Sequence, residues 1–349
     1  MEKNKPLNKT IERSEVELSK TDFVSDQLVK WCPGCGAHSI LASVENVFPK
    51  IGYKKESFVI VSGIGCSSRF PYYVNTYGIH GIHGRANAIA TGVKVANPHL
   101  SVWIATGDGD SMAIGGNHFI HIIRRNIDVN ILLFNNKIYG LTKGQYSPTS
   151  PMGSVTKTSP HGTIEHPFNP GELVLGSQGT FFARGVDTNP RMMTEIMFEA
   201  AKHDGTSVIE ILQNCIIFNP NIHSQVTAKE IKEDFQLNLR NGHPMLFGKN
   251  NEKGIRINGT KLEVVTIGEK GITENDILIH DQYEKDPGIH LMLAKMEPPY
   301  YPMALGVIRS AMYPTYDDLI EEKISLGKKN SDMKTVDDLL NSGDVWEIK

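Results

Sequence analysis

Short apolar runs alternate with segments of helical periodicity through the middle of the chain. The apolar runs with the length of β-strands are residues 58–62, 102–106, 129–134, 181–184 and 207–212. The segments predicted to be helices are residues 37–48, 86–96 and 190–203. Asn189 and Pro190 supply an N-cap and a first helical proline for the last of these. Strands that alternate with helices are typical of an α/β fold with a parallel sheet, and we expect that architecture here.

The strands predicted at residues 102–106 and 129–134 lie at the centre of this pattern. The segment between them is long enough for a crossover helix, so the two strands should be parallel neighbours. The first strand runs into the sequence GDGD at residues 107–110, and the second runs into NN at residues 135–136. In an open parallel sheet, ligands bind outside the carboxyl ends of the strands. The two polar turns are therefore expected to face one point.

The pattern divides the chain into four parts. They are a polar N-terminal arm at residues 1–22, an α/β domain at residues 23–225, a C-terminal extension at residues 226–318 and a charged peripheral tail at residues 319–349. The arm shows little periodicity, so it should be disordered or lie on a partner. The extension changes to an antiparallel pattern after residue 245, and we expect a β-hairpin or meander that projects from the core.

Three segments inside the α/β domain carry further expectations. Residues 77–85 are rich in glycine and histidine and should form a turn. Residues 144–179 are rich in proline, glycine, serine and threonine, and so long a loop usually covers a site or an interface. Residues 207–212 should form the last strand of the core sheet.

Composition narrows the class of protein. With 349 residues, the chain is long enough for one large α/β domain with appendages. Its hydrophobic content of 40% and charged content of 21% are those of an ordinary soluble protein. The net charge of −3 gives no basic surface, so we expect no nucleic-acid partner. The N-terminus is polar from its first residue and no apolar run approaches the roughly 20 residues of a membrane span, so a cytoplasmic location without membrane contact is expected.

The residues that follow the two central strands suit a magnesium diphosphate. Mg²⁺ prefers oxygen ligands and usually takes few of them from protein. The Asp108 carboxylate, the Asn136 amide oxygen and the Ile138 backbone carbonyl meet that need. Glycines on both sides of Asp108 would let a diphosphate approach the backbone, and a helix beginning near Ser111 would point N–H groups at it. GDG followed by NN after 25 residues resembles the thiamine diphosphate motif of ThDP-dependent enzymes, and two unrelated polar turns are the alternative.

The chain has four cysteines, which are Cys32, Cys35, Cys66 and Cys215. Cys66 and Cys215 each come just after a strand, at the edge that should carry the diphosphate, and the CxxC precedes a predicted helix. A disulfide is not favoured in a chain expected in the cytosol. Structural zinc suits four cysteines, although zinc ribbons usually carry two CxxC pairs. A 4Fe-4S cluster tolerates one CxxC with two isolated cysteines, so it is the preferred interpretation and zinc the alternative.

Taken together, the motifs resemble the β subunit of 2-oxoacid:ferredoxin oxidoreductases. The motifs are WCPGCG, GIGCSS, HGRA, GDGD, NN-x-x-YGLTKGQ and the fourth cysteine, in that order, with ILIHD and PTYDD further on. The resemblance runs from about Asp22 to Asp318. It implies a ThDP-binding fold, in which this subunit supplies the diphosphate-binding half of the site and a 4Fe-4S cluster beside it. A separate α subunit would supply the pyrimidine-binding half, in a heterodimer or heterotetramer.

The resemblance also implies the reaction. A 2-oxoacid would lose carbon dioxide on thiamine diphosphate, its electrons would pass singly through the cluster to ferredoxin, and coenzyme A would take the acyl group. The implied thiamine diphosphate contacts are Gly107, Asp108, Gly109, Asp110, Asn136, Ser67, His83 and Thr142, with Gln145 as a further candidate. The implied substrate-binding residues are Arg69, Leu141 and Lys143, and no single residue is assigned as catalytic.

Arg69 decides the expected substrate. Arginine binds a carboxylate with two parallel donors, and 2-oxoglutarate keeps a distal carboxylate that pyruvate lacks. The stretch GIGCSSRFPYY resembles members of the family that act on 2-oxoglutarate, so that substrate is predicted. Pyruvate or another 2-oxoacid is the alternative. A non-redox ThDP decarboxylase or carboligase with structural zinc, and a catalytically silent binding subunit, are the alternatives from other classes.

Overall fold

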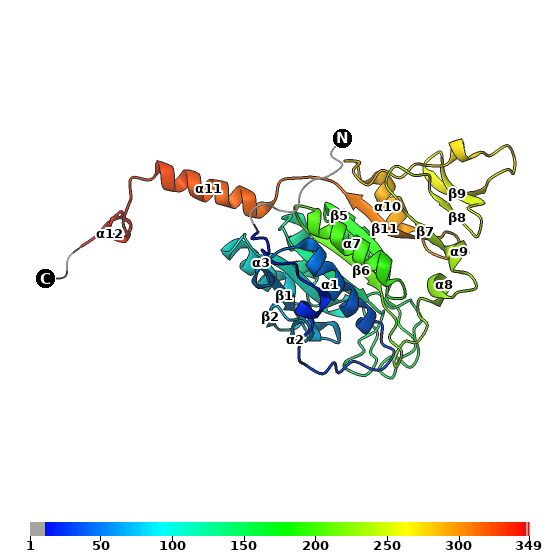
Figure 1. Cartoon of the computed structure of the whole chain (residues 1–349), viewed down its shortest axis with the longest axis horizontal. Helices are drawn as coiled ribbons and strands as arrows, with labels where there is room; N and C mark the ends of the chain where they lie inside the picture. The colour runs from blue at the N-terminus through cyan, green and yellow to red at the C-terminus, as the bar shows by residue number, and fades with distance from the viewer. Residues whose placement is uncertain (1–10, 347, 349) are drawn as a thin grey trace.

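The computed structural model describes residues 11–346 and residue 348. Its body is an eight-stranded sheet between two layers of helices, with a small second sheet at one end and a long helical tail (Figure 1). The strands of the large sheet are β1 (Phe58–Ser62), β2 (Tyr77–His80), β3 (Ser101–Gly107), β4 (Asn130–Asn135), β5 (Phe181–Val186), β6 (Ser207–Leu212), β7 (Gln236–Asn238) and β11 (Met303–Ser310). Their order across the sheet is β2-β1-β3-β4-β6-β5-β11-β7. The predicted α/β fold with a mostly parallel sheet is confirmed.

The central strands are parallel and buried along their whole length. β3 pairs with β4, β4 with β6, and β6 with β5, all in parallel register. Every residue of β4, β5 and β6 is buried, because helices cover both faces of a parallel sheet. These strands therefore read as continuous apolar runs, which is why the sequence pattern located them.

Two expectations about the sheet were wrong. Residues 77–80 form the edge strand β2 rather than part of a turn; all four residues are exposed, so they lack the apolar run that marks an inner strand. β6 is not the last strand of the core, because β11 pairs antiparallel with β5 and β7 pairs with β11. Both added strands come from the predicted C-terminal extension, which thereby completes the main sheet.

Helices cover both faces of the sheet and also form the tail. They are α1 (Ala37–Ile51), α2 (Phe70–Tyr73), α3 (Ala86–Ala96), α4 (Asp108–Met112), α5 (Gly116–Arg124), α6 (Pro170–Gly176), α7 (Pro190–Lys202), α8 (Ser224–Thr227), α9 (Lys232–Phe235), α10 (Gly288–Lys295), α11 (Tyr316–Asn330) and α12 (Val336–Leu340). α1 and α7 cover one face of the sheet, and their apolar side chains form one buried cluster with it. α3, α5, α6 and α10 cover the other face and share a second cluster.

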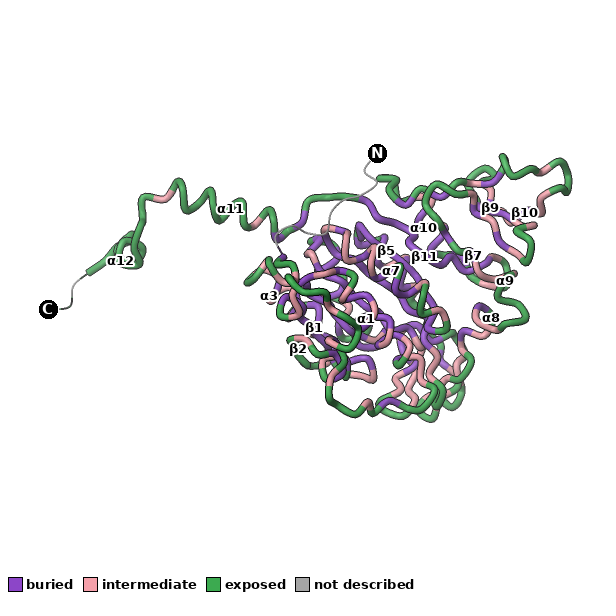
Figure 2. The backbone as a smooth tube through the Cα atoms, in the orientation of Figure 1, coloured by how far each residue is buried: buried purple, intermediate pink, exposed green. Residues whose placement is uncertain are grey.

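Burial follows these layers (Figure 2). The sheet and the inner sides of the helices are buried, whereas loops, the tail and the outer helix faces are exposed. The predicted crossover segment between β3 and β4 contains two helices, α4 and α5, rather than one that starts near Ser111. α4 begins at Asp108 itself, so the GDGD sequence is already the first turn of a helix.

The expected hairpin is present. β9 (Lys253–Asn258) and β10 (Lys261–Thr266) are antiparallel, and β8 (Leu246–Phe247) adds a third strand. Apolar residues on their inner side, among them Ile255 and Leu262, join the same buried cluster as α10. The small sheet is thus packed on the body rather than held by a linker.

The described part of the N-terminal arm lies on its own chain. Ile11 is buried, the Arg13 guanidinium lies 5.5 Å from the centre of the Tyr53 ring, and Lys20 forms an ion pair with Glu45 at 3.3 Å. For residues 11–22, the expectation of a disordered arm is therefore wrong, because these residues pack on their own chain. Residues 1–10 fall outside the described part of the chain.

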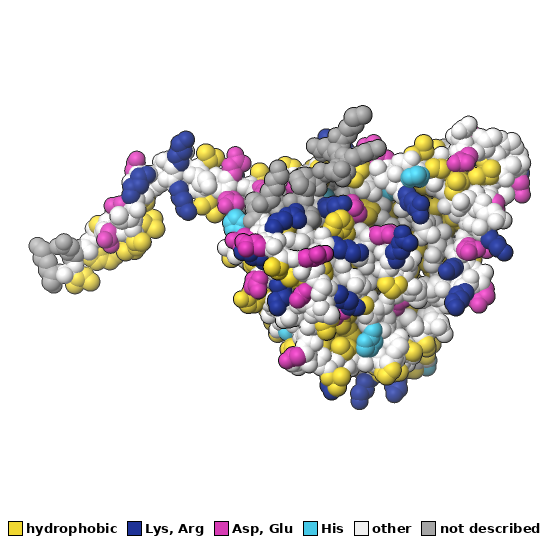
Figure 3. Space-filling model, in the orientation of Figure 1, with side chains coloured by type: hydrophobic (Ala, Val, Ile, Leu, Met, Phe, Trp, Pro, Cys, Tyr) yellow, Lys and Arg dark blue, Asp and Glu magenta, His cyan; other side chains and the backbone are white. Residues whose placement is uncertain are grey.

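The tail extends away from the body. Of the described side chains in α11, Asp317 is buried, and those in α12 are all exposed. Apolar side chains lie along this tail (Figure 3), including Ile324, Leu339 and Trp346. Within the described residues, no helix combines the length and the apolar character that crossing a membrane requires.

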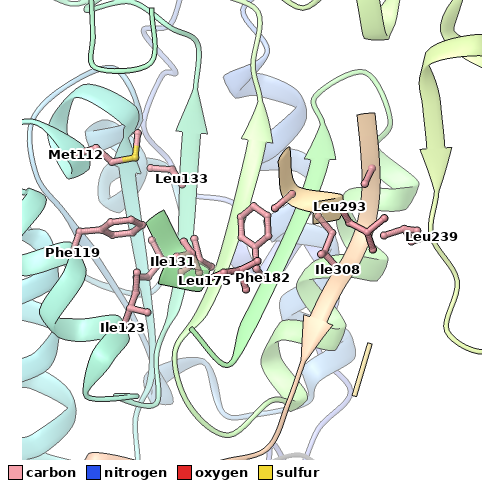
Figure 4. Close-up of a cluster of buried hydrophobic side chains, with 14 of the residues drawn as sticks. Met112, Phe119, Ile123, Ile131, Leu133, Leu175, Phe182, Leu239, Leu293 and Ile308 are labelled. Atoms are coloured by element: carbon pink, nitrogen blue, oxygen red, sulfur yellow. The ribbon is translucent and has the colours of Figure 1, made fainter. Parts of the chain in front are cut away.

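The cluster between the sheet and the α5 layer shows how the body is held together (Figure 4). Phe119 and Ile123 of α5 pack toward Ile131 of β4, while Leu293 of α10 lies beside Ile308 of β11. The antiparallel strand β11 is therefore fixed by side-chain packing as well as by its ladder to β5. This packing keeps the carboxyl ends of the parallel strands in fixed relative positions.

Candidate functional site

A cavity of about 510 Å³ opens at the carboxyl ends of β1, β3 and β4. It is lined by Ile64, Gly65, Cys66, Ser67, His83, Gly107, Asp108, Gly109, Asp110, Phe134, Asn136, Ile138, Tyr139, Gly140, Leu141, Thr142, Gln145 and Gln213. All the residues predicted to contact thiamine diphosphate or magnesium are in this set. Parallel strands end at one edge of the sheet, so residues distant in sequence meet there.

Asp108 is a buried carboxylate held by hydroxyl groups. Ser147 and Thr149 donate hydrogen bonds to its Oδ2 atom, over 2.6 and 2.5 Å. In the described part of the chain, its side-chain partners are these hydroxyls and not a lysine or an arginine. Burial raises the pKa of the Asp108 carboxyl, and the two hydroxyls oppose that rise. A carboxylate buried beside oxygen donors and without a basic partner suits a bound divalent cation.

The other two predicted magnesium ligands lie in a tight turn after β4. The Asn136 Oδ1 atom accepts a hydrogen bond from the Ile138 backbone N–H at 3.2 Å, and the Asn136 amide donates to Gln213 Oε1 at 3.1 Å. Lys137 between them has a φ of 54°, which turns the chain back on itself. The turn therefore brings Asn136 and Ile138 to the wall that faces Asp108.

Asp110 connects two loops at the cavity to strand β3. Its Oδ1 atom accepts hydrogen bonds from the backbone N–H groups of Ile64 and Gly84, at 3.1 and 2.8 Å, and lies 2.6 Å from Nδ1 of His83. Its Oδ2 atom accepts a hydrogen bond from the Thr106 hydroxyl at 2.8 Å. His83 lines the cavity, and its Nδ1 atom is fixed by this contact. Asp110 thus stabilises the walls of the site through hydrogen bonds. The sequence predicted it only as a cofactor contact.

The glycines of the site have different roles. A Cβ atom on Gly109 would lie 2.3 Å from the Tyr139 ring, whereas one on Gly107 would meet nothing closer than 3.7 Å. The Tyr139 hydroxyl also donates to the Gly109 carbonyl at 2.9 Å, and burial raises the pKa of Tyr139 to about 12. Gly109 is therefore required by the packing of Tyr139, and Gly107 is the glycine that leaves its backbone open to the cavity.

The four cysteines line a second cavity, of about 240 Å³, next to the first. Cys32 and Cys35 lie in the turn before α1, Cys66 follows β1, and Cys215 follows β6. The Trp31 indole donates to the Cys66 carbonyl at 2.7 Å, and the Gln213 amide donates to the Cys35 sulfur at 3.4 Å. Burial, with the neighbouring thiols, raises the pKa of Cys66 to about 11.

The two cavities are adjoining. Cys66, Asn136, Gly140, Leu141 and Gln213 line both of them. Among the described residues, no group of three or more cysteine, histidine or acidic side chains is placed to hold a single metal ion. A cluster attaches each thiolate to a different iron, so four sulfurs around one cavity match its donor set without converging on one point.

The three predicted substrate-binding residues differ in which cavities they line. Arg69 lines the cysteine cavity and also a third cavity of about 470 Å³, together with Lys30, Tyr72 and His80. Leu141 lines all three cavities. Lys143 is exposed and lines none of these three.

Comparison with known proteins identifies the family. The family described as "Thiamine pyrophosphate enzyme, C-terminal TPP binding domain" matches residues 63–211. The "2-oxoglutarate oxidoreductase subunit KorB" of Mycobacterium tuberculosis is 46% identical over 330 residues, which cover 94% of this chain and 88% of that protein. This chain belongs to the β-subunit family of 2-oxoacid:ferredoxin oxidoreductases.

Two further β-subunit relatives and one solved structure support this family assignment. The "2-oxoglutarate synthase subunit KorB" of Archaeoglobus fulgidus is 44% identical over 59% of this chain and 76% of its own. The "2-oxoacid:ferredoxin oxidoreductase 2, subunit beta" of Aeropyrum pernix is 44% identical over 57% of this chain and 64% of its own. The 2-oxoglutarate:ferredoxin oxidoreductase of Magnetococcus marinus, solved with 2-oxoglutarate, coenzyme A and succinyl-CoA, superposes with a TM-score of 0.75 at 30% identity, over 96% of this chain and 99% of that chain. The predicted family, its fold and its enzymatic class are confirmed.

Several residues of this β-subunit site were missed from the sequence. Ser147 and Thr149 come from residues 144–179, a segment predicted to be one long loop over a site. That prediction was wrong for residues 170–176, which form α6 behind the Asn169 N-cap. Gln213 lines both cavities directly after β6. Its position could have identified Gln213 as a site residue, because it follows a strand at the same sheet edge as Asp108 and Asn136.

Asp110 provides a test of the site's architecture that needs no cofactor. Changing Asp110 to Ala removes one carboxylate and leaves the N–H groups of Ile64 and Gly84 without their acceptor. We expect the free energy of unfolding to fall by about 1–3 kcal/mol, since that is the cost of leaving one buried donor unpaired and the Gly84 N–H is such a donor. Denaturant unfolding measures it, with the exposed Asp26→Ala as control. A loss below about 0.5 kcal/mol would show that Asp110 does not brace these loops.

Proposed function

We propose that this chain is the β subunit of a 2-oxoglutarate:ferredoxin oxidoreductase. The observation that carries the proposal is the contact between the two cavities, one bordered by the GDGD and NN turns and the other by all four cysteines. Relatives named for 2-oxoglutarate support it, as does the similar structure that holds 2-oxoglutarate and succinyl-CoA. The reaction is the oxidative decarboxylation of 2-oxoglutarate to succinyl-CoA and carbon dioxide, with electrons delivered to ferredoxin.

Asp108, Asn136 and the Ile138 carbonyl hold Mg²⁺ in the larger cavity, and the open backbone at Gly107 receives the diphosphate. Thiamine diphosphate, when bound, supplies the nucleophilic carbon and the electron sink for decarboxylation. Ser67, His83, Thr142 and Gln145 line the same wall and contact the cofactor or the bound substrate. The mostly apolar wall, with Phe134, Ile138 and Leu141, keeps water from the reacting atoms.

The four cysteines ligate a 4Fe-4S cluster in the smaller cavity. Such a cluster supplies one-electron transfer, which a zinc ion in the same place would not. The Gln213 amide, which donates to the Cys35 sulfur, and the partly buried surroundings tune its potential. The two cavities would hold thiamine diphosphate and the cluster next to each other, because Cys66 and Gly140 border both of them.

The active enzyme is a heterodimer or heterotetramer with an α subunit. The relatives in Mycobacterium tuberculosis and Archaeoglobus fulgidus are named as subunits, which supports a partner chain. That chain supplies the pyrimidine-binding half of the thiamine diphosphate site. Coenzyme A is the acyl acceptor and ferredoxin the electron acceptor, as the name and the bound molecules of the similar structure support.

Arg69 binds the distal carboxylate of 2-oxoglutarate. It lies beside the cofactor cavity, in a third cavity that also contains Lys30 and His80, so the local charge favours an anion. Its guanidinium contacts the Tyr73 hydroxyl at 3.4 Å, which limits its orientation. Leu141 forms the apolar wall between this cavity and the diphosphate site.

The cluster proposal predicts a defined metal content. After anaerobic purification with the α subunit, each copy of this chain should contain about four iron atoms and about four acid-labile sulfides. Broad absorbance in the visible range should accompany them. Cys215→Ala should lose the 4Fe-4S spectrum, because Cys215 is one of the four thiolates around the cavity. Zinc in place of iron, or an unchanged spectrum in the variant, would reject the cluster assignment.

The substrate proposal predicts a selective loss. Arg69→Met should lower kcat/KM for 2-oxoglutarate by about ten- to hundredfold, because a lost charge-assisted contact is worth roughly 1.5–3 kcal/mol. Residual activity on 2-oxobutyrate, which has no distal carboxylate, should be unaffected. Arg124→Met is the matched control, since Arg124 is an exposed arginine outside the three cavities. An equal loss on both substrates would mean that Arg69 binds the carboxylate common to all 2-oxoacids.

A further inference from the structure

A line of buried polar side chains crosses the sheet and ends at Asp108. Arg184 of β5 donates from Nε to Glu210 of β6 at 2.7 Å, and Glu210 accepts from the Asn135 amide of β4 at 2.7 Å. Asn135 Oδ1 lies 3.0 Å from the Thr149 hydroxyl, which lies 2.5 Å from Asp108 Oδ2. All five residues are at least 98% buried. The strand order β3-β4-β6-β5 makes this line possible, because Arg184 and Glu210 are partners in the parallel ladder.

The charge of Glu210 sets the orientation of the groups beyond it. Its Oε2 atom is taken by Arg184 and its Oε1 atom faces Asn135. A carboxylate only accepts hydrogen bonds, so Asn135 must turn its NH₂ group toward Glu210 and its oxygen toward Thr149. Thr149 has one hydroxyl proton, and it lies between two acceptors, Asp108 Oδ2 at 2.5 Å and Asn135 Oδ1 at 3.0 Å, which share it. The ion pair on β5 and β6 thus determines which end of the Asn135 amide faces the Thr149 hydroxyl beside Asp108.

Stability alone does not explain a charged pair at this position. Burying two charges is costly, and replacing such a pair with apolar side chains of similar volume is often neutral or stabilising. Arg184 is anchored a second time by the Ala294 carbonyl of α10, at 3.1 Å, so its guanidinium is fixed from both sides. The two strands are otherwise apolar, and a rigid polar line leading to one functional carboxylate indicates a role in positioning.

We propose that Glu210 and Arg184 are positioning residues for the magnesium site, an inference that rests on the proposed function. The pair orients Asn135, Asn135 orients the Thr149 hydroxyl, and that hydroxyl holds Asp108. Both hydroxyls that contact Asp108, from Ser147 and Thr149, engage Oδ2, so the protein fixes this end of the carboxylate. Outer-shell partners of this kind tune metal affinity because they fix the ligand before the metal binds.

The test replaces the pair with apolar side chains of similar size. In the complex with the α subunit, Arg184→Met/Glu210→Leu should fold with an unfolding temperature near that of the wild type when magnesium is absent. Its Kd for MgCl₂, measured by titration calorimetry at saturating thiamine diphosphate, should rise by about 10- to 100-fold. The matched control is Arg256→Met/Glu263→Leu, because that exposed ion pair on the β9–β10 hairpin has the same chemistry at a distance from the site.

Each outcome decides the proposal. A folded double variant with the wild-type Kd for magnesium would overturn it. If the double variant does not fold, Glu210→Gln decides, because it is isosteric and its neutral amide no longer forces Asn135 to turn its NH₂ group toward it: a weaker magnesium Kd supports the proposal, and an unchanged Kd overturns it. A wild-type complex that needs no magnesium to bind thiamine diphosphate would instead reject the proposed function.

Discussion

The burial of the Asp108 carboxylate is the constraint on which the rest of the site depends. β3 leads into α4 at Asp108, and there the carboxylate is buried against the Ser147 and Thr149 hydroxyls at the wall of the cavity. A negative charge in such surroundings is costly unless a cation balances it. Several features of the site suit a cation that balances the charge of Asp108. They are the facing turn at residues 136–138, the open backbone at Gly107, and the Ser147 and Thr149 hydroxyls. The site is thus built around a charge that the described side chains do not neutralise.

The cysteine cavity depends on the same sheet edge. β1 and β6 lie on opposite sides of the β3–β4 pair, and their following turns bring Cys66 and Cys215 to either side of Gly140. A Cβ atom on Gly140 would lie 3.4 Å from the Cys215 sulfur and 3.8 Å from that of Cys66, so this backbone passes directly between the two thiols. The topology therefore places the proposed cluster site and the proposed thiamine diphosphate site next to each other.

The sequence allowed prediction of those parts of the molecule that local patterns encode. β1, β6 and α3 lie where their apolar runs and helical spacing placed them, and the residues at the strand ends meet because parallel strands end together. β2 and β11 were missed for physical reasons: β2 is an exposed edge strand, and β11 joins the sheet antiparallel from a distant part of the chain. Ser147, Thr149 and the Arg184–Glu210 pair were missed because their partners are tertiary. A glutamate inside the apolar run SVIEIL and an arginine inside FFARGV were the available signals.

We propose that electrons from the oxidation of 2-oxoglutarate at the diphosphate site reduce the cluster on this chain. Electron paramagnetic resonance of the complex with its α subunit tests it directly, after addition of 2-oxoglutarate and coenzyme A under anaerobic conditions. The wild type should show a reduced 4Fe-4S cluster. Asp108→Ala should retain a cluster that dithionite reduces but that 2-oxoglutarate does not, because the cofactor is no longer held. Reduction of the variant's cluster by 2-oxoglutarate at the wild-type rate would contradict the account.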